Sequence, residues 1–375
     1  MIQKLKTFIE KETVMVIAFL LALVSCFFMT PSLTQLAGFV DFRVLGILLS
    51  LMVVVAGLQR VGAFDWIGVK LLVHVSDTRS LVLVLVMLCF FLSMAVTNDV
   101  ALLTFVPFAI FVLEKSGHPE LLVSTVVLQT VAANLGSMLT PVGNPQNLYI
   151  YQHYRFTAAS FIETVLPYAA AAFLMLLILI FLGKKESIRL AQTDFAAVHT
   201  DWKRAGAYVL LFCVAIAAVT GLFYWFPAML LILLAAFLSD REILRTVDYC
   251  LLLTFVFFFV FIGNMGSIPL VRDLLGSLLT GNEAVVSILA SQVISNVPAT
   301  LLLSEFTENS RDLLIGVNLG GLGTLIASMA SLISYKLYAH RYNETKGRYL
   351  LWFTVVNLVF LAVLYGLYLA LGRVC

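Results

Sequence analysis

The chain has 375 residues, of which 62% are hydrophobic and only 12% are charged, and its mean hydropathy is +1.03. A soluble domain carries about 25% charged residues, so this composition excludes an ordinary soluble protein. Uncharged runs of about 17 to 25 residues recur along the whole chain, as is typical of a polytopic helical membrane protein in a lipid bilayer. The net charge of +2 comes with no basic, aromatic-laced patch, so we expect no nucleic-acid partner.

Motifs for metals and nucleotides are missing from the sequence. The five cysteines and five histidines are dispersed, with no CxxC pair, no Cys/His metal spacing and no HExxH motif. No Walker-A phosphate loop is present. We therefore predict no metal site and no cofactor beyond a coupling ion.

The first half of the chain predicts spans, a hairpin and a break. Two apolar runs, 81–96 and 100–113, flank Thr97-Asn98-Asp99, which favours a helical hairpin around 81–113 that dips into the membrane. The alternative is a continuous pair of spans with Asp99 at a membrane surface. The other elements expected in this half are spans at 13–29 and 44–58, an interfacial amphipathic helix at 61–79, a broken span at 121–152 and a clean span at 164–182.

The broken span is the most informative stretch of the sequence. No charged residue occurs between 121 and 152, yet the middle of this run holds Gly136, Pro141, Gly143 and Pro145, which an unbroken helix disfavours. Backbone freed by a break at membrane depth is tolerated only where protein or a water-lined cavity satisfies it, so a polar break indicates a binding site. The alternative is a kink whose polar residues hold neighbouring helices together.

A linker at 184–204 with five Lys or Arg residues divides the chain and is expected to be cytoplasmic. In the second half, Ser295-Asn296-Val297-Pro298 interrupts a second predicted hairpin around 284–307. A second weakened span follows at 313–335, with Asn318 to Thr324 at its centre. The other spans expected in this half lie at 206–222, 228–238, 250–264 and 349–371.

The two halves match in sequence. The motif from Asn134 to Thr140 aligns with that from Asn318 to Thr324, and Asn98 aligns with Asn296. We therefore predict two repeats, 1–183 and 205–375, although chance similarity between apolar segments is the alternative. Counting basic residues places the N-terminus in the cytoplasm and gives the repeats opposite orientations. The predicted fold is all-α, with two inverted repeats that each carry a re-entrant helical hairpin and a broken transmembrane helix.

Four polar breaks should converge on one site at the midplane. Asn144 is a plausible helix cap, and half-helix N-termini present free N–H groups that suit an anion. Asp99 is the only charged residue between Arg79 and Glu114; it is the expected coupling-ion or proton site, together with Thr97 and Ser331, unless it merely caps a helix or lies near the interface. The predicted substrate-binding residues are Asn98, Asn134, Thr140, Gly143, Asn144, Asn147, Ser295, Asn296, Thr324 and Ser328.

At these motifs the chain resembles the ion transporter superfamily of arsenite permeases, citrate transporters and divalent anion/sodium symporters. Thr97-Asn98-Asp99 and the Gly143-Asn144-Pro145-Gln146-Asn147 run are most similar to the arsenical-pump membrane protein branch. The hairpin tips differ from the Ser-Asn-Thr motif of the dicarboxylate symporters. The resemblance implies a dimerising scaffold and a transport half that moves as an elevator.

We therefore predict a secondary active transporter in a bacterial-type inner membrane that moves a small anion or oxyanion coupled to H⁺ or Na⁺. We expect it to form a homodimer. A carboxylate, an inorganic anion and an arsenite-like metalloid are all included. The alternative is a cation/proton exchanger that uses Asp99 as its exchange site. An intramembrane enzyme would need a paired acid, a nucleophile dyad or a metal box, which the spans do not show, so we expect no enzyme.

Overall fold

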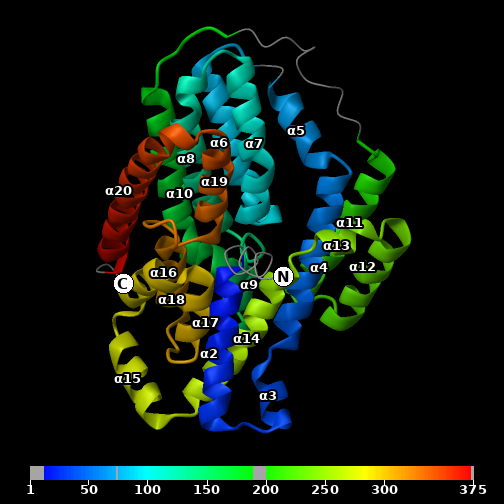
Figure 1. The fold of residues 1–375 in the computed structure, drawn as a ribbon, viewed down its shortest axis with the longest axis vertical. Helices are drawn as coiled ribbons and strands as arrows, with labels where there is room; N and C mark the ends of the chain where they lie inside the picture. The colour runs from blue at the N-terminus through cyan, green and yellow to red at the C-terminus, as the bar shows by residue number, and fades with distance from the viewer. Residues whose placement is uncertain (1–11, 73–74, 189–199, 373–375) are drawn as a thin grey trace.

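The computed structural model describes residues 12–72, 75–188 and 200–372 (Figure 1). Within these residues every regular element is a helix, apart from one isolated β-bridge between Asp77 and Ser187. Seven helices are long and apolar enough to cross a membrane, or eight if one bent pair is counted as a span. The expected all-α, polytopic class is therefore confirmed.

The helices in chain order, with two short 3-10 helices, are α2 (Thr13–Met29), α3 (Leu33–Phe39), α4 (Phe42–Arg60), α5 (Ala63–Leu72), α6 (Thr78–Val96), α7 (Asn98–Lys115), η1 (Pro119–Leu121), α8 (Leu122–Ser137), α9 (Pro145–His153), α10 (Ala158–Leu182), α11 (Trp202–Val219), α12 (Trp225–Ser239), α13 (Glu242–Thr246), α14 (Tyr249–Gly266), α15 (Pro269–Leu279), α16 (Glu283–Ile294), α17 (Asn296–Ser304), α18 (Ser310–Gly320), α19 (Met329–Arg341), η3 (Asn343–Thr345) and α20 (Lys346–Gly372).

Helix α8 forms the centre of the molecule. In its candidate span 83% of the residues are buried, against 28% for the span that contains α20. Helices α6, α7, α19 and α20 all pack against α8. Gly136 lets α6 approach closely, because a Cβ at this position would lie 2.1 Å from the carbonyl oxygen of Phe90. The most polar of the predicted spans is thus also the most enclosed.

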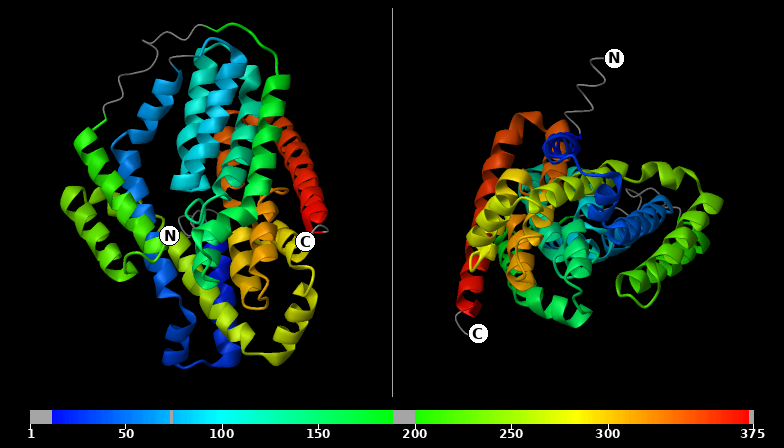
Figure 2. Two further views of the ribbon diagram at one scale, coloured as in Figure 1. Left: turned by 180° about the vertical axis from the view of Figure 1, so that it is seen from behind. Right: turned by 90° about the horizontal axis from the view of Figure 1, so that it is seen from below.

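Helices α4, α11 and α12 form a separate unit at one side of the molecule, which we call the side bundle (Figure 2). Gly57 of α4 lies against the ring of Tyr208 in α11, so a larger residue would push these two helices apart. Arg60 pairs with Asp240 at one end of the bundle. On the other side of the core, α2 packs along α14.

Both predicted hairpins are present as packed helix pairs, α6 with α7 and α16 with α17 (Figure 1). Each pair turns at a single non-glycine residue with a positive φ: Thr97 has φ 71° and ψ 147°, and Ser295 has φ 71° and ψ 155°. This backbone region belongs almost entirely to glycine and costs about 1–3 kcal/mol for other residues. Because α6 is by itself long enough to span a membrane, re-entry of the hairpin stays a prediction.

Both predicted broken helices are confirmed. Helix α8 ends at Ser137 and α9 begins at Pro145, while α18 ends at Gly320 and α19 begins at Met329. The side chain of Asn144 accepts a hydrogen bond from the backbone N–H of Asn147 (2.9 Å), so Asn144 is the predicted helix cap. Proline at the first helical position has no N–H to satisfy, which makes Pro145 a good start for α9.

Two parts of the predicted helix pattern are wrong. The amphipathic helix expected at 61–79 ends at Leu72, because Asp77 caps a new helix by accepting from the N–H of Ser80 (3.1 Å). Helix α15 was not expected; the chain bends by 113° between α15 and α16.

Much of the predicted linker, 189–199, lies outside the described residues. The start of the linker is hydrogen-bonded to α6, because the N–H of Thr78 donates to the carbonyl of Glu186 (2.9 Å).

Replacing Gly136 with alanine should destabilise the protein by about 1–3 kcal/mol, because the new methyl group would overlap the backbone of α6. Thermal unfolding in detergent measures this loss. Gly206→Ala is the matched control, since nothing lies within 4 Å of its Cβ position and alanine favours a helix. Equal melting temperatures for both variants would contradict the close approach of α6 and α8.

The carboxylate of Glu114 joins the end of α7 to the end of α19. It accepts hydrogen bonds from the hydroxyl of Tyr342 and from Arg341 Nε (2.8 Å) and Nη2 (2.6 Å). These donors, Tyr342 foremost, hold the pKa of Glu114 below its usual range despite partial burial. The stabilisation is therefore present above the unfolded pKa and is lost as the pH falls through the folded pKa.

At neutral pH, Glu114→Gln should cost about 0.5–1 kcal/mol, a modest amount because Arg341 is exposed. The melting temperatures of Glu114→Gln and the unmodified protein should converge as the pH falls through the lowered folded-state pKa of Glu114, because the native carboxylate is then itself protonated. Glu344→Gln is the control, as Glu344 is exposed near the same end. A gap that stays constant down to acidic pH would rule out this ion pair as its source.

Candidate functional site

The ends of four half-helices meet at the centre of the molecule, where α8 and α18 stop and α9 and α19 start. Asn318, in the last turn of α18, donates from Nδ2 to Asn147 Oδ1 at 2.7 Å. Its Oδ1 accepts from Asn144 Nδ2 at 3.3 Å. The second broken helix is thereby bonded to the first residues of α9, which belong to the other half of the chain.

The same exchange occurs in the opposite direction. Asn134, which the sequence aligns with Asn318, donates from Nδ2 to Ser331 Oγ at 3.2 Å and accepts from Ser328 Oγ at 3.0 Å. Ser328 and Ser331 occupy the positions that match Asn144 and Asn147. We call these six buried residues the crossing cluster: Asn134, Asn144, Asn147, Asn318, Ser328 and Ser331.

Side-chain amides satisfy the backbone carbonyls that the breaks release. Asn147 Nδ2 lies within hydrogen-bond distance of the carbonyls of Ser137, Met138 and Thr140, at 3.1–3.2 Å. In the second break, Gln292 Nε2 donates to the carbonyls of Gly320 and Leu322, both at 2.9 Å. Both breaks are therefore held by hydrogen bonds within the protein, as a break at membrane depth requires.

The two hairpin tips contact the two breaks in matching ways. The N–H of Asn98 donates to the carbonyl of Gly143 (3.1 Å), and the N–H of Asn296 donates to that of Ala327 (3.0 Å). Thr140 donates to the carbonyl of Met94 in α6, and Thr324 to that of Gln292 in α16 (3.3 Å). The inverted repeat stays a prediction, and these recurring contacts support it.

The side chains at the tips differ between the two hairpins. Asn98 Nδ2 donates to Asn134 Oδ1 (3.0 Å), and Asn98 Oδ1 accepts from the N–H of Asp99 (3.0 Å). By contrast, Asn296 as a whole residue is 4% exposed, and its side-chain amide has no hydrogen-bond partner among the described residues. The hydroxyls of Thr97 and Ser295 and the carboxylate of Asp99 also lack a partner within that part of the chain.

The structure thus brings most of the predicted residues together. Thr324 is the exception, because it is exposed at the surface beside α16. Sequence reasoning missed the roles of Asn318, Gln292 and Gln129, although each is a polar residue in an apolar run. Gln129 Nε2 donates to the carbonyls of Leu85 and Phe105, both at 3.1 Å, and so ties α8 to both helices of the first hairpin.

Charge at the site is confined to carboxylates. Sequences 80–113, 284–304 and 313–335 contain no Lys or Arg, and Asp99 is their only charged residue. Asp248, the cap of α14, is close enough to Asp99 for an electrostatic interaction. Among the described residues, no group of three or more His, Cys, Asp or Glu could hold a metal ion.

Comparison with known proteins now identifies the family. A family model described as citrate transporter matches residues 7–311. The chain belongs to the citrate transporter family. It is 34% identical over 328 residues to the uncharacterized transporter MJ0456 of Methanocaldococcus jannaschii, covering 87% of this chain and 88% of that protein.

Two further relatives extend this result. The inner membrane protein YbiR of Escherichia coli is 32% identical over 338 residues, covering 87% of this chain and 89% of that protein. The silicon efflux transporter LSI3 of Oryza sativa subsp. japonica is 32% identical over 129 residues, which cover 34% of this chain and 26% of that protein. The predicted membership of the ion transporter superfamily is confirmed, and the protein is a membrane transporter.

The crossing cluster should behave as one energetic unit. Asn147→Ala and Asn318→Ala should each cost about 1–3 kcal/mol, because each leaves buried polar partners unsatisfied. The double variant should lose less than the sum, with a coupling of at least about 0.5 kcal/mol. Thermal unfolding of all four proteins measures this, with Asn282→Ala as an exposed control. Strictly additive losses would contradict a direct bond between the two asparagines.

Proposed function

We propose that the protein is a secondary active transporter that moves a small anion or oxyanion across an inner membrane, coupled to H⁺ or Na⁺. A carboxylate, an inorganic anion or an arsenite-like metalloid would suit this site. The observation that carries the proposal is the meeting of two strained hairpin tips with two broken helices, where a buried amide and a carboxylate are left without partners. Broken helices of this kind mark substrate sites in transporters.

Hydrogen-bond donors at the tips favour an anionic or oxygen-rich substrate. The residue that precedes each of helices α7, α17 and α19 makes no side-chain cap, so the positive end of each helix dipole is not offset there by a capping oxygen. The N–H groups of Asn98, Asp99 and Asn296 already donate within the protein, so the dipole and the remaining first-turn N–H groups are what a substrate would meet. Anions bind readily at such helix starts. The Asn296 amide adds a side-chain donor beside α17. The fixed amides of the crossing cluster would hold these helix ends in position around the substrate.

Asp99 is the proposed coupling residue. Asp99 is an acid in the first turn of α7, where it also suits the positive end of the helix dipole. Its carboxylate has no hydrogen-bond partner among the described residues, so it is free to bind an ion. Its negative charge would repel an anion unless a proton or Na⁺ neutralised it first, and this requirement links substrate binding to ion binding. The hydroxyl of Thr97 lies two residues before Asp99 in the sequence, and Ser331 accepts a hydrogen bond from Asn134 (3.2 Å). Both remain proposed contributors to the ion site.

A cation/proton exchanger is the second candidate, because one observation favours it. Asp99 is the only charged residue in the stretches 80–113, 284–304 and 313–335, and a carboxylate with no basic residue in these stretches suits a cation better than an anion. In that case Asp99 would be the exchange site and no anion would bind. An intramembrane enzyme gains no support, since the family and two of the three named relatives are described as transporters.

The membrane location and the oligomeric state are proposed from one relative and from the family resemblance. The printed name of the Escherichia coli relative places that protein in the inner membrane, and we propose the same location here, with a cytoplasmic N-terminus. We also propose a homodimer that forms through the scaffold, as the family resemblance implies.

A thermal-stabilisation screen separates the two candidate functions. Purified protein in detergent would be heated with arsenite, phosphate, sulfate and C4–C6 carboxylates, each with and without Na⁺ and at two pH values. A ligand that binds only the folded state raises the melting temperature. Stabilisation by one anion that requires Na⁺ or low pH would support the anion transporter. Stabilisation by cations alone would support the exchanger.

Asp99→Asn should abolish ion-coupled uptake into proteoliposomes, by at least about tenfold, while leaving the protein folded. Its melting temperature should stay near that of the unmodified protein, because no described residue depends on the carboxylate for a hydrogen bond. Glu163→Gln is the matched control, since Glu163 is an exposed carboxylate in α10. Normal coupled transport by Asp99→Asn would refute the coupling role.

A further inference from the structure

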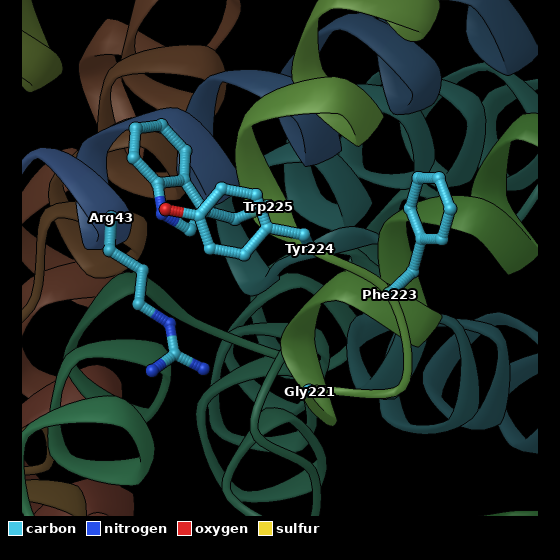
Figure 3. A pocket seen from close by; sticks show the side chains of 5 residues that line it. All are labelled: Arg43, Gly221, Phe223, Tyr224 and Trp225. Atoms are coloured by element: carbon cyan, nitrogen blue, oxygen red, sulfur yellow. The ribbon is translucent and has the colours of Figure 1, made fainter.

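A cavity of about 410 Å³ lies at one end of the side bundle, lined by Arg43, Gly221, Phe223, Tyr224 and Trp225 (Figure 3). Arg43 is in the first turn of α4, and the other four residues lie where the chain passes from α11 to α12. The Arg60–Asp240 pair marks the opposite end of α4. Since α4 and α11 are both candidate spans, this cavity lies at a membrane surface.

The polar side chains that line the cavity carry hydrogen-bond donors that no described residue accepts. The guanidinium of Arg43, the indole N–H of Trp225 and the hydroxyl of Tyr224 have no hydrogen-bond partner among the described residues. Arginine and tryptophan side chains can only donate, and arginine is always charged. Figure 3 shows the guanidinium extending below the two rings. A fitting ligand must therefore be negatively charged and rich in acceptor oxygens.

Arg43 is exposed and forms no ion pair with any carboxylate in the part of the chain that the structure describes. Asp41 is near in sequence, but its carboxylate accepts from the backbone N–H groups of Arg43 and Val44, both at 3.0 Å, and it forms no ion pair with the guanidinium. Trp225 is fixed in place, because its ring packs on Gly46, where a Cβ would lie 2.6 Å from it. The site is thus partly preformed around an uncompensated positive charge.

Apolar side chains continue from the cavity toward lipid. Leu222 is 85% exposed, Phe42 57% and Phe223 44%. Tryptophan and tyrosine gather at the headgroup level of a bilayer, where a ring can contact both acyl chains and polar groups. A soluble inorganic anion would leave these apolar side chains unused. A ligand that combines a phosphate with acyl chains would use both parts of the surface.

We propose that this cavity binds an anionic phospholipid, with its phosphate on Arg43, Tyr224 and Trp225 and its acyl chains along Leu222 and Phe223. The side bundle that carries the cavity is also bonded to the first broken helix, because Gln152 Nε2 of α9 donates to the carbonyl of Val219 at the end of α11 (2.7 Å). This site is separate from the substrate site of the proposed transporter.

Delipidated full-length protein in detergent provides the test. Phosphatidylglycerol should raise its melting temperature, and phosphatidylcholine should do so much less. Arg43→Gln should bind phosphatidylglycerol about tenfold more weakly, because a charge-assisted contact is lost. Tyr224→Phe removes one exposed hydroxyl without touching the packing and should weaken binding about threefold. Native mass spectrometry of the bound lipid gives a second readout.

Arg272→Gln is the control, because Arg272 is an exposed arginine on α15, away from the cavity. It should respond to phosphatidylglycerol as the unmodified protein does. Inorganic phosphate and citrate are added separately to distinguish a soluble anion from a lipid. Equal responses of Arg43→Gln, Tyr224→Phe and the unmodified protein would overturn the proposal. So would Arg43-dependent stabilisation by phosphate without any effect of phosphatidylglycerol.

Discussion

A helix that breaks inside a membrane must find partners for its freed backbone within the protein, and the whole core depends on this constraint. Here each break relies on residues from another element. The amide of Asn147 donates to the carbonyls at the end of α8, and the amide of Gln292 donates to those at the end of α18. Asn134 and Asn318 then bond each broken helix to the start of the other half's short helix. Neither break is self-sufficient, so the two halves of the chain must fold against each other.

Contacts that recur in both halves and contacts that differ have separate roles. In both halves the N–H of the tip asparagine donates to a carbonyl of the break, and a threonine hydroxyl of the break donates to a carbonyl of the hairpin, so these contacts satisfy backbone groups. The crossing cluster also recurs in both halves. The differences concern side chains that are free to meet a ligand. Asp99 follows one tip asparagine and Val297 the other, while Asn98 is bonded and Asn296 is not. An acid at one tip and a free amide at the other suit two unlike occupants, as coupling requires.

Much of this architecture could be predicted from the sequence, because Pro141 and Pro145 cluster with Gly136 and Gly143 and the polar tips interrupt long apolar runs. A single proline is a weaker signal, as Pro107 lies inside α7. The pairing within the crossing cluster could not, since residues far apart in sequence make it. Gln292 and Gln129 were overlooked because a single amide in an apolar run is equally consistent with a residue that only packs against neighbouring helices. The end of the helix expected at 61–79 was visible in principle, because Asp77-Thr78-Arg79-Ser80 has the pattern of a helix start.

The strained tips explain why a hydroxyl residue stands at each. Glycine would adopt φ 71° at Thr97 and Ser295 with little strain, whereas a side chain there costs about 1–3 kcal/mol. Neither hydroxyl offsets this cost by bonding to a described residue. Besides a Cβ atom, both side chains add a hydroxyl oxygen where the hairpin meets the break. We propose that this oxygen serves a substrate or a coupling ion, since packing alone would not require it.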